Sequence, residues 1–334
     1  MKMSNLNYFD SKGRTLIAVF LFVLISLNAS AGSGLKFKDQ KFKIIQFTDL
    51  HYVHSDKHKA QNDSTIELMR LLIEEEKPDL VVFTGDVVVS SPALEGWDRV
   101  TQPMTKLQVP FAVNFGNHDT ETDVTTSEIL EHLSKNPMSV TENQVKGISG
   151  QGNCSLPIQS SNGKQDEMVV YLFDSKAYSD HGKVSGYGWV KHDQIDWYRK
   201  TSQAYANKNK RVVPALAFFH IPLPEYAIVR EQEATLGNNT ERVHAPTMNT
   251  GLLSAFVEMS DVKGVFVGHD HNNDFIGGIF GVALVYGRKT GYVPAYTEIL
   301  DRGARVIELT EGADFFETYI RTRSDKLLEY TFPY

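Results

Sequence analysis

Short apolar runs alternate along most of this chain with stretches whose apolar residues recur at helical spacing. The runs predict buried strands that end at or near Phe47, Thr84, Phe115, Asp174, Phe219 and Val267. The stretches between them predict helices over residues 64–76, 93–106, 125–134, 191–207 and 249–259. Because strands that alternate with helices are typical of parallel βαβ units, the sequence predicts an α/β fold.

The pattern changes after residue 271. Strand-like runs at 280–286, 305–309 and 315–321 follow one another without a helical stretch between them. This change predicts a second, more antiparallel sheet. We therefore expect two mixed sheets packed face to face with helices on the outside, which is a four-layer α-β-β-α sandwich.

The first 31 residues have the pattern of a cleaved secretory signal. Lys12 and Arg14 precede an apolar run over 16–27, which ends in Ala29-Ser30-Ala31. The run is shorter than the roughly 20 residues that a membrane-spanning helix needs, although an uncleaved anchor is the alternative. We expect cleavage after Ala31, a secreted or periplasmic protein without a stable membrane span, and a single domain over 32–334. The motifs described below fall within about residues 41–290, and 291–334 complete the strands.

Charge and cysteine content narrow the possible classes of protein. The net charge of the chain is −7, and removal of residues 1–31 would bring it to about −9. A nucleic-acid-binding surface is therefore not expected, because such surfaces are usually basic. The single cysteine, Cys154, excludes an intrachain disulfide, so the domain must rely on a large core.

Five polar motifs directly follow predicted strands, where the loops of α/β proteins carry binding groups. They are Asp49-Leu50-His51, Gly85-Asp86, Gly116-Asn117-His118-Asp119, His220 and Gly268-His269-Asp270-His271. Together they supply the aspartate, asparagine and histidine ligands of a two-metal site. A carboxylate such as Asp86 can bridge two cations about 3.5–4 Å apart, which suits in-line displacement at phosphorus. This mixed ligand set favours iron, manganese or zinc over calcium.

In this order, the five motifs resemble those of the calcineurin-like metallophosphoesterases. The phrases at 219–224 and 286–292 resemble the small, single-domain type of the purple acid phosphatase-related branch. The resemblance implies two divalent or mixed-valence transition metal ions, with Asp86 bridging them. One ion would be bound by Asp49, His51 and His271, and the other by Asn117, His220 and His269.

The resemblance also implies the roles of the remaining site residues. His118 would bind phosphate and protonate the leaving group, and Asp119 would orient the His118 ring. Arg288 could contact the substrate phosphate through a bidentate pair, or it could form a structural salt bridge. Purple acid phosphatases carry a metal-binding tyrosine three residues after the bridging aspartate. Val89 occupies that position here, so we expect no purple iron–tyrosinate centre.

These inferences predict an acid phosphatase-like hydrolase with a small phosphorylated substrate. A metal-bound hydroxide would attack a phosphate monoester, with His118 as the general acid. One alternative is a phosphodiesterase acting on nucleotide or phospholipid-headgroup diesters. An alternative of another class is a non-catalytic, secreted, metal-containing binding protein. The retention of His118 favours an enzyme, because a site that only held metals would not need it.

Overall fold

The computed structural model describes residues 34–141 and 147–333. The secretory signal predicted for residues 1–31 lies outside the described residues and stays a prediction. The described residues belong to one compact unit. Among them, no helix combines the length and the apolar character that a membrane span requires.

The first sheet contains six strands in the order β12-β11-β10-β1-β2-β3. Their bounds are β1 Lys41–Phe47, β2 Leu80–Thr84, β3 Phe111–Asn114, β10 Gly303–Thr310, β11 Phe316–Thr322 and β12 Lys326–Phe332. The first three strands are parallel, with Ile45 opposite Val81 and Val82 opposite Ala112. The last three strands add to the other edge of β1 as an antiparallel meander.

The second sheet also contains six strands, in the order β4-β5-β6-β7-β9-β8. Their bounds are β4 Cys154–Gln159, β5 Asp166–Leu172, β6 Ala215–Phe218, β7 Val262–Val267, β8 Ile276–Ile279 and β9 Val282–Tyr286. Strands β5, β6, β7 and β9 are parallel, and the two edge strands are antiparallel. Both sheets are therefore mixed: the parallel strands form one half of the first sheet and the centre of the second.

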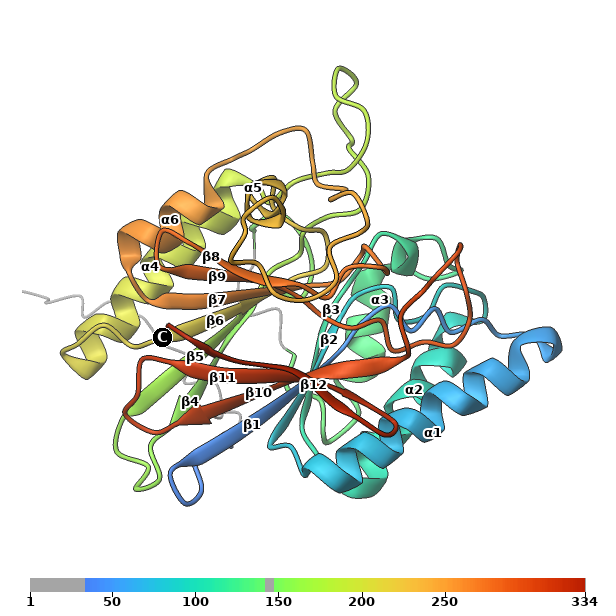
Figure 1. The fold of residues 1–334 in the computed structure, drawn as a ribbon, viewed down its shortest axis with the longest axis horizontal. Helices are drawn as coiled ribbons and strands as arrows, with labels where there is room; N and C mark the ends of the chain where they lie inside the picture. Colours follow the sequence, from blue (N-terminus) through green and yellow to red (C-terminus); the bar gives the residue numbers. More distant parts are fainter. Residues whose placement is uncertain (1–33, 142–146, 334) are drawn as a thin grey trace, which may run out of the picture. The chain divides into compact units, whose positions relative to one another are not determined.

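Helices cover the outer face of each sheet, so that the layers follow the order helix, sheet, sheet, helix (Figure 1). The first sheet packs against α1 Lys59–Glu76, α2 Ala93–Leu107 and α3 Thr126–Leu133, and the second against α4 His192–Asn209, α5 Tyr226–Arg230 and α6 Leu252–Met259. A third apolar cluster, which includes Ile44, Val82, Leu216 and Phe266, fills the space between the sheets. The predicted four-layer sandwich is confirmed.

Two details differ from the sequence prediction. The strands at the C-terminal end do not form a sheet of their own, because β10 pairs with β1 and β9 pairs with β7. The helix predicted to begin near residue 64 begins at Lys59 instead. Ser64 resembles a helix cap in sequence, but its hydroxyl donates to the Ala60 carbonyl from inside the helix.

The packing between the sheets can be tested with a pair of matched leucines. Leu216 on β6 is fully buried between the sheets, whereas Leu327 on β12 is 41% exposed. Leu216→Ala should lower the free energy of unfolding by about 2–5 kcal/mol, because it removes buried methyl groups and leaves a cavity. Leu327→Ala should change it by less than about 1 kcal/mol. Urea unfolding of both variants measures this difference, and equal losses would contradict a well-packed layer between the sheets.

Candidate metal centre

The predicted motifs meet where the carboxyl ends of the parallel strands of both sheets come together. Asp49, Asp86, His220 and His269 each lie two residues beyond the end of a strand: β1, β2, β6 and β7, respectively. A cavity of about 480 Å³ opens at this edge, and its lining includes His51, Asp86, His118, His269 and His271. The structure thus brings together side chains that are up to 222 residues apart in the sequence (Asp49 to His271).

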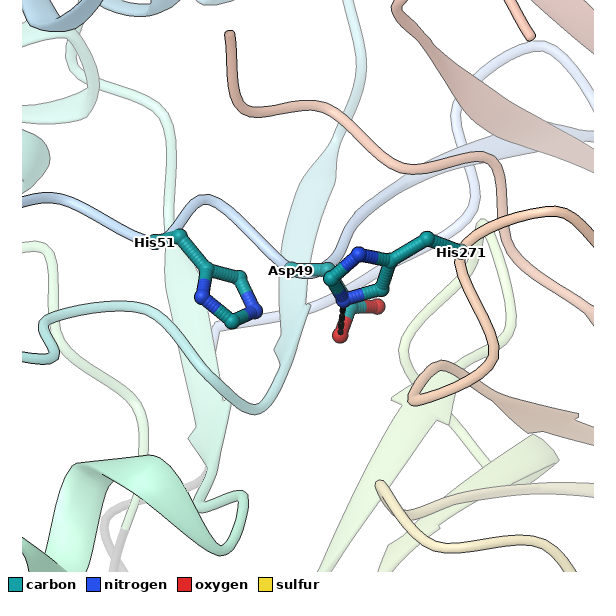
Figure 2. Close-up of side chains that lie close together, drawn as sticks. All are labelled: Asp49, His51 and His271. Carbon is teal, nitrogen blue, oxygen red and sulfur yellow. Dashed lines mark ion pairs between the residues drawn. The ribbon is translucent and has the colours of Figure 1, made fainter. Parts of the chain in front are cut away.

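The first ligand group consists of Asp49, His51 and His271, whose donor atoms lie within 4.8 Å of one another. Figure 2 shows the two imidazole rings beside the Asp49 carboxylate, with His271 Nε2 3.3 Å from Asp49 Oδ1. Asp49 and His51 have φ values of 53° and 49°, in the left-handed region that non-glycine residues rarely adopt. Backbone hydrogen bonds to Gly85 and Asp86 hold this turn in place.

The second ligand group consists of Asp86, His220 and His269. Asp86 Oδ2 lies 3.2 Å from His220 Nε2, and His220 Nε2 lies 3.2 Å from His269 Nδ1. The same Asp86 oxygen is 3.7 Å from Nε2 of His51, which belongs to the first group. Asp86 therefore lies between the two groups, in the place that a bridging ligand would occupy.

Hydrogen bonds fix the rings of two of the predicted histidine ligands. His220 Nδ1 donates to the Thr84 carbonyl at 2.7 Å, and His271 Nδ1 lies 2.6 Å from the Glu298 carboxylate. In both rings Nε2 is left to face the centre, which is the arrangement of metal-binding histidines. Sequence reasoning missed Glu298, because it lies in a connection without a motif, 27 residues after His271.

Two buried donor atoms indicate that the residues fit bound cations. His51 Nε2 and Asn117 Oδ1 have no hydrogen-bond partner among the described residues. Leaving a buried polar atom unpaired costs about 1–3 kcal/mol, and coordination of a cation would satisfy both atoms. The resemblance assigns Asn117 to the second group, and its unpaired buried oxygen is available for that role.

The electrostatics of the two facing imidazoles lead to the same conclusion. Burial lowers the pKa of His220, but Asp86, Asp49 and the hydrogen bond to the Thr84 carbonyl together outweigh burial and raise it to about 10. Burial and the nearby charge of His220 lower the pKa of His269 to about 4. Cation binding would replace protons on donor atoms of this kind. The donor set fits a dinuclear metal centre.

His118 lies beside the two groups and belongs to neither. It begins the short 3-10 helix η2 His118–Thr120, and its side chain is 38% exposed at the cavity. Its backbone N–H donates to Asp86 Oδ1 at 2.9 Å. Its Nδ1 lies 2.7 Å from the Glu121 carboxylate. His118 is therefore a positioned imidazole that remains open to a ligand in the cavity.

The structure corrects the role predicted for Asp119. Its carboxylate accepts hydrogen bonds from the backbone N–H groups of Val87, Val88 and Gly116, at 3.0, 3.0 and 2.8 Å. It joins the turns that follow β2 and β3, and Glu121 contacts the His118 ring in its place. The 3-10 turn explains this exchange of partners. Side chains three residues apart, such as those of His118 and Glu121, lie on the same side of such a turn, whereas adjacent side chains point in different directions.

The structure also decides between the two roles considered for Arg288. Its Nε donates to Asp274 Oδ2 at 2.9 Å, and its Nη2 forms an ion pair with the same carboxylate. The residue is 5% exposed and is not part of the cavity lining. The predicted contact with substrate is therefore wrong, and the structural salt bridge is right. The adjacent Lys289, which sequence reasoning missed, supports the centre by donating to the Asp49 carbonyl at 2.9 Å.

Val89 lies in the cavity lining, at the position where purple acid phosphatases have their metal-binding tyrosine. Its side chain is aliphatic and offers no donor atom. Tyr187 and Tyr296 also line the cavity, so the expectation of a centre without tyrosinate stays a prediction.

Two motif glycines are required because ligand carboxylates rest directly against the backbone. A Cβ atom on Gly116 would lie 2.1 Å from Asp86 Oδ1. A Cβ atom on Gly268 would lie 2.6 Å from Asp49 Oδ2 and closer still to the Thr48 hydroxyl. Any side chain at these positions would displace a predicted ligand.

Gly116→Ala should therefore reduce metal binding, because the added methyl group displaces the Asp86 carboxylate. Gly182→Ala is the matched control, since a Cβ atom there meets no heavy atom within 4 Å. Metal analysis after loading and dialysis should find fewer ions per chain in Gly116→Ala than in the control. Equal metal content in the two variants would contradict the close packing of Asp86 against Gly116.

Comparisons with known proteins agree with this geometry. Residues 42–273 match the family described as calcineurin-like phosphoesterase. A protein of Arabidopsis thaliana named probable inactive purple acid phosphatase 29 is 34% identical in an alignment of 297 residues that covers 80% of this chain and 76% of the relative. Phosphatase DCR2 of Saccharomyces cerevisiae is 31% identical in an alignment of 264 residues that covers 70% of this chain and 45% of that protein.

A solved structure shares the fold. The dimetal phosphatase from Danio rerio superposes with a TM-score of 0.58 at 15% identity, covering 86% of this chain and 98% of that structure. The relative from Arabidopsis thaliana agrees with the resemblance to the purple acid phosphatase-related branch. With the motifs placed together as predicted and most of the chain matched, the protein belongs to the calcineurin-like phosphoesterase family.

Proposed function

We propose that the protein hydrolyses phosphate monoesters at the dinuclear centre, with His118 as the general acid. One observation carries the proposal: a positioned, partly exposed histidine lies in the same cavity as two complete ligand groups and belongs to neither. A site that only stored metal would not need this histidine. A small phosphorylated compound is the substrate class that we propose.

Bound cations would supply Lewis acidity toward the ester and toward the attacking water. The protein contributes the orientation of the acid. The Asp86 carboxylate holds the backbone of His118, and Glu121 holds its Nδ1, which leaves Nε2 to protonate the leaving oxygen. Tyr178 steadies Glu121, because its hydroxyl donates to that carboxylate at 2.9 Å.

The name of the relative from Arabidopsis thaliana includes the word inactive, and that word describes the plant protein. In this chain, all seven positions predicted to bind metal carry side chains with suitable donor atoms. Donor atoms of six of them lie in the two groups, and the seventh, Asn117, has the unpaired buried oxygen. These observations support a metal-loaded centre in this chain, which hydrolysis requires.

Hydrolysis of phosphodiesters is the second candidate. It is favoured by the cavity volume of about 480 Å³, which exceeds what a phosphate group needs and leaves room for a second substituent. The same ligand groups and the same acid would serve both reactions.

A hydrolysis panel of aryl phosphate monoesters and diesters, run on metal-loaded protein, tests the proposal. The wild type should hydrolyse monoesters, and His118→Ala should keep its metal but lose about 10²- to 10⁴-fold in kcat, because the leaving group is no longer protonated. His181→Ala, which changes an exposed histidine outside the cavity lining, is the control.

Two results would contradict this proposal. A metal-loaded wild type that hydrolyses neither ester class would favour the binding protein. Unchanged turnover in His118→Ala would remove His118 from the mechanism.

A further inference from the structure

A second pair of a carboxylate and an imidazole, His244 and Asp270, lies at the same cavity. His244 Nδ1 is 2.6 Å from Asp270 Oδ1, and the His244 backbone N–H donates to Asp270 Oδ2 at 3.1 Å. His244 lies in the long connection between α5 and α6, whereas Asp270 lies between the predicted ligands His269 and His271. The pair thus ties this connection to the turn that carries two ligands.

The carboxylate of this pair is held firmly. Asp270 is 3% exposed, and its Oδ2 also accepts a hydrogen bond from the Tyr286 hydroxyl at 2.6 Å. Tyr286 ends strand β9 and is fully buried. Two bonds to a fixed carboxylate give His244 a defined position, although the segment around it has no regular secondary structure.

His244 and His118 lie beside different ligand groups. The His118 ring is 5.6 Å from the ring of His51 in the first group, and the His244 ring is 6.5 Å from the ring of His269 in the second. Both His118 and His244 belong to the cavity lining. Asp270 occupies Nδ1 of His244, and no partner of its Nε2 occurs within the described parts of the chain. Nε2 is therefore available to a ligand in the cavity.

The rest of the cavity lining offers a phosphate little positive charge. Its described members include neither lysine nor arginine, but they do include the carboxylates of Glu121, Glu241 and Asp270. Apart from bound cations, the histidines are the groups there that can carry positive charge. The hydrogen bond to Asp270 raises the pKa of His244 above its ordinary value, against the effect of burial. This favours an N–H donor at Nε2.

We propose that His244 is a further substrate-binding residue, whose Nε2–H donates to a non-bridging phosphate oxygen of the ester beside the second ligand group. Asp270 is its positioning residue. The inference rests on the proposed function for the identity of the ester, but phosphate binding itself can be measured without turnover. His118 would then act on the leaving group, and His244 would hold the phosphate.

The test is calorimetric titration of inorganic phosphate into the metal-loaded full chain. His244→Ala should weaken phosphate binding by about 10- to 100-fold, the range for a lost hydrogen bond to a charged group. His244→Gln should recover part of this loss, because its amide N–H can still donate. His132→Ala is the matched control, since His132 also pairs with a carboxylate, Asp98, at 2.6 Å but outside the cavity lining.

Metal content and steady-state kinetics complete the experiment. All four proteins should bind the same number of metal ions, and His244→Ala should raise KM more than it lowers kcat. Phosphate affinity that is unchanged in His244→Ala, or a wild type that binds no phosphate, would overturn the inference. Loss of metal from His244→Ala would also overturn it, by assigning His244 to the metal centre. If the wild type binds phosphate through His244 but hydrolyses no ester, the proposed function fails and this inference stands.

Discussion

The position of Asp86 between two ligand groups is the constraint on which the rest of the site depends. One of its carboxylate oxygens faces a histidine of each group, and the other holds the backbone of His118. This position requires a left-handed backbone at Asp86 itself, with a φ of 49°, and a glycine at 116 against which the carboxylate packs. The sandwich makes this possible, because parallel strands of both sheets end at one edge.

The residues around the centre fall into two sets. One set holds the predicted ligands in place, and the other is open to a substrate in the cavity. Three groups hold predicted ligands in place: the Thr84 carbonyl, the Glu298 carboxylate and the buried Lys289 ammonium group. His118 and His244 are each held by a carboxylate and stay open to the cavity. The same physical device, an imidazole fixed through Nδ1, thus serves both predicted ligands and candidate substrate contacts.

The sequence was sufficient to predict the four layers, the strand ends and the meeting of the ligand-type residues, because these depend on local pattern and on short motifs. It failed where a contact depends on distant chain segments. Glu298 lies outside any motif, and Arg288 binds Asp274, which precedes it by 14 residues. The family resemblance implied Asp119 as the partner of His118, but the 3-10 turn places Glu121 there. Nor did the sequence predict that β10 to β12 extend the first sheet, because the pairing of β10 with β1 joins segments that are far apart in the chain.

The central claim is that Asp86 bridges two cations in one centre. Metal analysis of Asp86→Asn, beside the wild type and the exposed variant Asp325→Asn, tests it most directly. Two ions per chain are expected in the wild type and in Asp325→Asn, and fewer in Asp86→Asn, because an amide is a weaker bridge than a carboxylate. Two tightly held ions per chain in Asp86→Asn would contradict a bridging role for Asp86.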